Sequence, residues 1–270
     1  MRALSLNGAA TTPTTRTRGW IQRLRPNPQA TLRLVCFPYA GGSAQIYSRW
    51  PRGLPRTVEV VAVQAPAHGL RLLEPPLTSM EDLVAGIVDA LQPELDRPFA
   101  LFGHSMGALV AFEVARELRR RELPMPVTLY VSAREAPTVE AQPSAIHKLA
   151  DAEFAEAIRG YGATPEDVLA SAELMRLLAP ALRGDFEICE TYEHVPESPL
   201  DCAIATFCGM ADPLVSRAAS EPWRDQTTSD WYLRMVPGAH FYIHSAERVL
   251  LQLVARDLAE RVELDRGLQR

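Results

Sequence analysis

The sequence lacks the features that mark membrane, secreted and nucleic-acid-binding proteins. It has no run of about 18 apolar residues, the length that a membrane-spanning helix needs. The net charge is −5 and the isoelectric point is near 5.7, so charge gives no reason to expect nucleic acid or an anionic membrane surface as a partner. Residues 1–27 are rich in Thr and Arg but contain no apolar stretch of the secretory-signal kind. We therefore expect a globular protein in the cytoplasm.

Motifs for metals and cofactors are also missing. The four cysteines, Cys36, Cys189, Cys202 and Cys208, do not have the spacing of zinc ligands. All but Cys189 lie in apolar, strand-like runs, where buried free thiols are common. The sequence contains neither a P-loop nor a G-x-G-x-x-G fingerprint. We expect no metal ion and no bound cofactor.

What the sequence does contain is an alternation of short apolar runs and helical patterns, which starts near residue 31. Six runs are typical of parallel strands covered on both faces: residues 31–37, 58–64, 99–103, 128–132, 203–209 and 231–236. Helical patterns occupy residues 79–91, with Ser79 as the expected N-cap, and also 106–121 and 245–260. This order predicts an α/β domain over residues 29–270 with a mostly parallel, doubly wound sheet. Residues 1–28 are expected to be a flexible tail that could dock partly through Trp20 and Ile21.

One long segment interrupts the alternation. Residues 144–199 contain helical patterns at 150–159, 165–170 and 172–182, and a weaker one at 185–192, but no clear strand. An ordinary crossover has loops of about 2–6 residues around one helix, so this segment is too long for one. We predict a helical lid insertion over about residues 136–199, lying above the active site. The alternative is a compact packing subdomain without a gating role.

The turn after the third predicted strand carries the sequence GHSMG at residues 103–107. The G-x-S-x-G pattern is weak alone, but a strand precedes it and a helix follows, as in the nucleophile elbow of α/β-hydrolases. Gly103 and Gly107 suit a turn that leaves no room for Cβ atoms. We therefore predict that Ser105 is the nucleophile and that the Met106 N–H, at the helix start, is one oxyanion donor. The alternative is an ordinary glycine-rich turn.

A second oxyanion donor is expected from the loop after the first strand, which reads PYAGGS at residues 38–43. Its glycines allow the backbone to approach a ligand closely. We assign the donor to the Ala40 N–H, with Gly41 as the second choice. Ser43 is only a formal rival nucleophile, because nothing places it on a strained elbow.

The acid and the base are expected to follow the nucleophile in that order. His240 lies on a Gly-containing loop just beyond the last predicted strand and is the expected base, while His244 is the alternative. Asp212 follows the strand that ends at residue 209 and is the expected acid; Glu135 is its rival, and an ordinary turn aspartate is the plain alternative. His104 is expected to buttress the elbow.

Six motifs occur in chain order: FPYAGGS at 37–43, EPPL at 74–77, FGHSMGA at 102–108, AFE at 111–113, ADPLV at 211–215 and PGAHF at 237–241. Together they resemble the type II (external) thioesterases that accompany polyketide synthases and nonribosomal peptide synthetases, over roughly residues 31–260. The resemblance implies a free-standing α/β-hydrolase with a helical lid. Such an enzyme removes stalled or misprimed acyl groups from the phosphopantetheine arm of acyl or peptidyl carrier proteins. It also places nucleophile, acid and base on Ser105, Asp212 and His240.

The chain departs from that family in the loop after the second strand, which reads QAPAHGLR at residues 64–71. The family usually has a Leu-Pro-Gly-Arg-Glu-like stretch here, so Ala67 and His68 replace a Gly-Arg pair. Because the loop lies near the entrance in this fold, the departure bears on substrate preference or carrier docking and not on the triad.

Charge gives little guidance on docking, because carrier proteins are usually acidic and this chain is acidic too. Arg116, Arg119, Arg120 and Arg121 form a basic cluster at the end of the predicted helix. We interpret the cluster as complementing the helix dipole and facing water. The protein is expected to be a monomer.

Three other functions remain open: a general carboxylesterase, a chain-releasing acyltransferase or cyclase domain, and a non-catalytic partner of a synthase. The initiator Met1 and the lack of an upstream carrier domain favour a free-standing enzyme over an excised domain.

Overall fold

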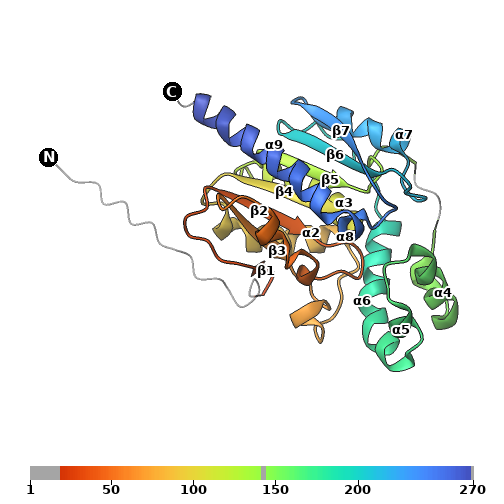
Figure 1. Ribbon diagram of the computed structural model, residues 1–270. Helices are drawn as coiled ribbons and strands as arrows, with labels where there is room; N and C mark the ends of the chain where they lie inside the picture. Colours follow the sequence, from red (N-terminus) through yellow and green to blue (C-terminus); the bar gives the residue numbers. More distant parts are fainter. Residues whose placement is uncertain (1–18, 141–143, 269–270) are drawn as a thin grey trace.

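A single mixed sheet organises the part of the chain that the computed structural model describes, residues 19–140 and 144–268 (Figure 1). Its seven strands follow the order β1-β3-β2-β4-β5-β6-β7. They are β1 (Ile21–Arg23), β2 (Leu32–Phe37), β3 (Val58–Val63), β4 (Phe99–His104), β5 (Thr128–Ser132), β6 (Ala203–Gly209) and β7 (Trp231–Val236). β2 to β7 pair in parallel, while β1 pairs antiparallel with β3. The six predicted strands and the mostly parallel sheet are confirmed.

The helices connect these strands in the expected alternation. They are α1 (Trp50–Gly53), α2 (Met80–Leu91), α3 (Met106–Arg120), α4 (Asp151–Tyr161), α5 (Glu166–Leu169), α6 (Ala172–Glu190), α7 (Arg217–Ser220), α8 (Tyr242–Ser245) and α9 (Glu247–Leu268). Short 3₁₀ helices cover Ala44–Tyr47, Gly69–Arg71, Gln92–Glu94, Ile146–Lys148 and Glu221–Gln226. The predicted cap is present, because the Ser79 hydroxyl accepts a hydrogen bond from the Asp82 N–H at 3.3 Å. None of the described helices is long and apolar enough to cross a membrane.

Side chains of the central strands alternate between the two faces of the sheet. In β2, Val35 and Phe37 join the core under α2 and α3, while Leu34 and Cys36 join the core under α1, α8 and α9. β2, β3, β4, β5 and β6 are buried along their whole length. This double coverage explains why their sequences read as continuous apolar runs rather than as alternating ones.

The N-terminal boundary differs from the prediction of a flexible tail over residues 1–28. Residues 1–18 lie outside the described part of the chain, but Ile21–Arg23 form β1 at the edge of the sheet. Trp20 is buried, and its ring occupies the space that a Cβ at Gly86 of α2 would need. The docking expected through Trp20 and Ile21 is present, whereas the prediction of a flexible tail is wrong for residues 19–28, which belong to the folded domain. A strand of three residues is too short to give a readable pattern.

The segment between β5 and β6 contains α4, α5 and α6, which lie together beyond the end of the sheet (Figure 1). This group, which we call the lid, has a small core of its own: Phe154, Ile158, Leu169, Leu182 and Phe186. Helices occur where the sequence predicted them, but the patterns at 172–182 and 185–192 form the single helix α6. It continues through Pro180, although an internal proline loses one backbone hydrogen bond.

The arginine cluster at the end of α3 is not a free basic surface. Arg116 is buried and pairs with Glu113 and Glu197, so the expectation that it faces water is wrong. Arg119 and Arg120 also pair with Glu197. Arg121 pairs with Glu117 and with Asp89 of α2. The cluster therefore ties α3 to the segment before β6, and its positive charge is largely compensated.

Candidate active site

Ser105 lies in a strained turn between β4 and α3. Its φ and ψ angles are 54° and −119°, a conformation that side chains rarely adopt. A Cβ at Gly103 would overlap the carbonyl oxygen of Gly107, and a Cβ at Gly107 would overlap that of Phe37. The Ser105 N–H donates to the Ser132 carbonyl oxygen at 2.8 Å, which joins the turn to β5. The turn therefore requires glycine at both positions, as the sequence predicted.

The structure brings together the three side chains that the sequence singled out. The Ser105 Oγ lies 3.1 Å from the His240 Nε2, and the His240 Nδ1 lies 2.9 Å from the Asp212 Oδ2. An ionised carboxylate at Nδ1 keeps the proton on that nitrogen, which leaves Nε2 free to accept the serine proton. Gly238, with φ of 118°, allows the chain to turn between β7 and His240.

Asp212 is held in a form suited to this arrangement. Its side chain is fully buried, and its Oδ1 accepts hydrogen bonds from the N–H groups of Leu214 and Val215 at 2.8 and 3.1 Å. Burial acts to raise the pKa of Asp212, but the contact with His240 and the two backbone donors outweigh it, and the pKa is lowered. The carboxyl group is therefore ionised at neutral pH.

The rival residues occupy other places. The His104 Nδ1 contacts the Ser132 Oγ at 2.9 Å beneath the elbow, and burial lowers the pKa of His104 well below its usual value. It therefore buttresses the turn as a neutral ring. The His244 Nε2 lies 2.8 Å from the hydroxyl of Tyr39, a residue of the loop after β2. Glu135 lines the chamber in front of Ser105, while Asp212 is the carboxylate that contacts His240.

The two expected oxyanion donors, Ala40 and Met106, line the same chamber as Ser105. Met106 is the first residue of α3, so its N–H has no partner four residues earlier in the helix. The Gly41 N–H donates to the Asp185 Oδ2 at 2.6 Å and is therefore already occupied. Between the two candidates in this loop, Ala40 is the one that the geometry favours.

The chamber has a volume of about 550 Å³ and separates the elbow from the lid. Its floor includes Tyr39, Ala40, Ser105, Met106, His240 and Phe241. Its roof includes Ile158, Tyr161, Leu182, Phe186, Cys189 and Glu190 from the lid. The volume is in the usual range for small-ligand sites, about 300–1,000 Å³.

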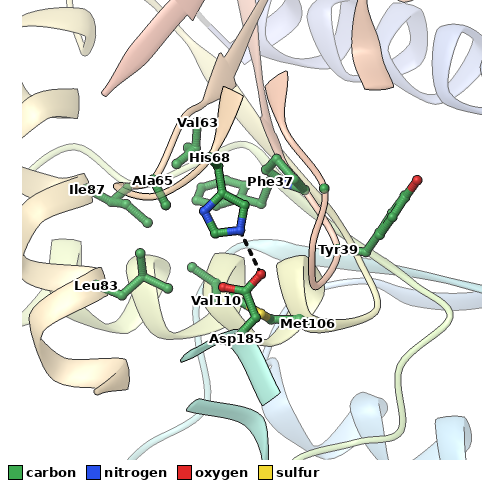
Figure 2. A pocket seen from close by; sticks show the side chains of 12 residues that line it. Phe37, Tyr39, Val63, Ala65, His68, Leu83, Ile87, Met106, Val110 and Asp185 are labelled. Carbon is green, nitrogen blue, oxygen red and sulfur yellow. Dashed lines mark hydrogen bonds and ion pairs between the residues drawn. The ribbon is translucent and has the colours of Figure 1, made fainter. Parts of the chain in front are cut away.

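A buried pair of side chains was not predicted from the sequence. It lies next to the loop after β2, residues 38–43, which we call the oxyanion loop. The His68 Nε2 lies 2.9 Å from the Asp185 Oδ2, and both residues line a small, mostly apolar cavity next to Phe37 and Met106 (Figure 2). Ala67 has a φ of 64°, a left-handed conformation that glycine adopts more readily. This accounts for the glycine that the resembling family carries at the position of Ala67. The sequence feature that could have revealed this pair is the histidine at residue 68, where the resembling family carries an arginine.

The fold and the Ser105–His240–Asp212 arrangement define the class of α/β-hydrolases. The comparison with family models is more specific, because the thioesterase domain matches residues 32–259, and the chain therefore belongs to the thioesterase family. The gramicidin S biosynthesis protein GrsT of Aneurinibacillus migulanus is 37% identical over 88% of this chain and 93% of its own length.

Two solved structures extend this similarity to the fold. RedJ, a thioesterase from the prodiginine pathway of Streptomyces coelicolor, is 42% identical with a TM-score of 0.79, covering 86% of this chain and 87% of its own. The type II thioesterase BorB from the borrelidin biosynthetic cluster is 36% identical with a TM-score of 0.80, covering 88% and 96%. The α/β-hydrolase fold class and a hydrolase that acts on thioesters, both predicted from the sequence, are confirmed.

Proposed function

We propose that this protein is an editing enzyme that hydrolyses stalled or aberrant acyl thioesters on the phosphopantetheine arm of acyl or peptidyl carrier proteins. The observation that carries the proposal is the hydrogen-bonded series Asp212–His240–Ser105 at the floor of a lidded chamber. The similarity of this chain to GrsT and BorB, which belong to gramicidin S and borrelidin biosynthesis, supports a role in nonribosomal peptide or polyketide assembly.

The first half of the reaction transfers the acyl group to Ser105. The His240 Nε2 takes the serine proton while the Ser105 Oγ attacks the thioester carbonyl. The N–H groups of Ala40 and Met106 stabilise the negative oxygen that forms. The C–S bond then breaks, and the pantetheine thiol leaves with the proton carried by His240.

The second half hydrolyses the acyl-enzyme. His240 takes a proton from a water molecule, which attacks the ester carbonyl in the same oxyanion site, and the proton then returns to Ser105 as the acid leaves. Asp212 stabilises the imidazolium in both halves. The reaction uses no cofactor beyond the arm of the partner protein.

The lining of the chamber supports an acyl group as the bound part of the substrate. Apolar lid side chains, including Ile158, Leu182 and Phe186, face Ser105 across the chamber and suit an alkyl chain. We propose that the carrier protein remains outside, that the enzyme acts as a cytoplasmic monomer, and that only the arm enters.

The test is the release of free acid from carrier proteins loaded with acetyl and longer acyl groups, by the wild type and by Ser105→Ala. The loss of the nucleophile of a working triad costs about 10⁶ in kcat, so turnover by the variant should fall to background. A matched oxoester measures the preference for the thioester. If the wild type hydrolyses simple esters but no loaded carrier, the editing role is wrong and the protein is a general esterase.

A further inference from the structure

The lid contacts the loop that carries Ala40 at Gly41, and it does so in two ways. The Leu182 side chain of α6 packs so closely on Gly41 that a Cβ there would overlap it. One turn further along α6, the Asp185 carboxylate accepts the Gly41 N–H at 2.6 Å. Since the Gly41 N–H belongs to the peptide that follows Ala40, its hydrogen bond fixes the backbone next to the Ala40 N–H.

The same carboxylate oxygen is held from behind by His68. The His68 Nε2 contacts the Asp185 Oδ2 at 2.9 Å (Figure 2). The His68 Nδ1 contacts the Pro66 carbonyl oxygen at 2.8 Å. A carbonyl oxygen and a carboxylate only accept hydrogen bonds, so both contacts are satisfied at once only when both ring nitrogens carry a proton. The geometry therefore calls for a positively charged imidazolium at residue 68.

The surroundings agree with a charged ring. Burial acts to lower the pKa of His68, but the Asp185 carboxylate and the Pro66 carbonyl outweigh it, and the pKa is raised above 6.5. The cavity around the pair is otherwise lined by apolar side chains and by Tyr39, whose hydroxyl contacts His244. Cys189, one turn beyond Asp185, stays a neutral thiol because burial raises its pKa to about 11.

We propose that Asp185 is a positioning residue which, held by His68, aligns the Ala40 N–H for the oxyanion, so that oxyanion binding requires the lid helix α6 to be docked. The proposal rests on the proposed function, because it takes Ala40 as an oxyanion donor. It also gives a functional consequence to the histidine at residue 68, where the resembling family carries an arginine. An arginine stays charged at every physiological pH, whereas this chain makes the anchor depend on a residue that titrates.

Loss of the His68 proton leaves a lone pair facing either the carboxylate or the carbonyl oxygen. The contact becomes repulsive, Asp185 is freed to shift, and Gly41 loses its fixed acceptor. Activity should therefore fall as the pH rises through the pKa of His68.

The experiment measures kcat and KM from pH 5.5 to 10 for the wild type, Asp185→Ala and His68→Arg, with an acyl thioester and with p-nitrophenyl acetate. Asp185→Ala should lower kcat with little change in KM, because the oxyanion forms only in the transition state. The loss should stay below the roughly 10²–10³-fold cost of deleting a donor, since the donor is misaligned and not removed. His68→Arg should lose the fall in activity at high pH.

The matched control is Asp151→Ala, which removes another lid carboxylate. Asp151 pairs with Arg183 of α6 and its side chain is exposed, so kcat should not change. Circular dichroism confirms that each variant is folded. The inference is overturned if Asp185→Ala retains the wild-type kcat, if only KM changes, or if His68→Arg keeps the fall in activity at high pH. Failure of the proposed function would appear separately, as a wild type active on the simple ester alone.

Discussion

The elbow that carries Ser105 and the loop that carries Ala40 line one chamber, but they are held in place differently. The elbow depends on the core: β4 is buried throughout, and Gly103 and Gly107 pack too closely to admit a Cβ. The loop depends on side chains from outside the sheet, because Tyr39 contacts His244 and Gly41 contacts Asp185 of the lid. The proposed nucleophile is therefore positioned by the sheet, whereas the loop that carries the proposed oxyanion donor is also held by the lid.

Among the changes that test this comparison, Asp212→Asn should have the largest effect on kcat, and it concerns the part of the site that the core positions. An asparagine keeps the size of the side chain but no longer holds His240 in the tautomer that accepts the serine proton. A loss of about 10⁴ in kcat is expected on that ground. The measurement is the rate of acid release from an acyl thioester.

Glu135→Gln is the control for this change, because Glu135 lines the same chamber. It should keep most of the wild-type rate. A large loss in Glu135→Gln together with a small one in Asp212→Asn would mean that the acid has been assigned to the wrong carboxylate.

Gly107→Ala in the elbow and Gly160→Ala in the lid compare how closely the two regions are packed around a glycine. A Cβ at Gly107 would overlap the backbone of Phe37, whereas a Cβ at Gly160 of α4 meets nothing within 4 Å. The first change should destabilise the protein by about 1–3 kcal/mol, as overpacking does. The second should stabilise it by about 0.5–1 kcal/mol, because alanine is the better helix former. Urea unfolding of both variants measures the difference, and equal effects would remove the distinction.

The pH dependence of stability should show the smallest effect and concerns the loop alone. Because the pKa of His68 is raised on folding, its contribution is fully present below about 6.5, the unfolded value, and is lost as the pH rises through the folded value. Melting temperatures of the wild type and His68→Arg, followed from pH 6 to 10, should diverge with the wild type falling faster. Parallel curves would show that the His68–Asp185 contact contributes nothing to stability.

Much of the candidate site could be predicted from the sequence, for a local reason. Ser105, Asp212 and His240 each follow a strand pattern, and the carboxyl ends of parallel strands meet at one edge of a sheet. The glycines that flank Ser105 are likewise dictated by the geometry of one short turn. Strand position and turn chemistry were therefore enough to predict that Ser105 and His240, which are 135 positions apart in the chain, share one site.

Other features have no local signature and were decided by packing alone. β1 is only three residues long and becomes a strand because β3 offers it a hydrogen-bonding edge. Arg116 is buried because Glu113 and Glu197 compensate its charge.

The sequence by itself predicted the chain order of the site: a nucleophile, an acid and a base after the third, fifth and sixth predicted strands, with a helical insertion between the nucleophile and the acid. Only the tertiary structure decided how the oxyanion loop is held. The contacts of Asp185 with His68 and Gly41 span 117 and 144 residues. No periodicity or spacing records such a contact, because it exists only once the lid packs against the loop after β2.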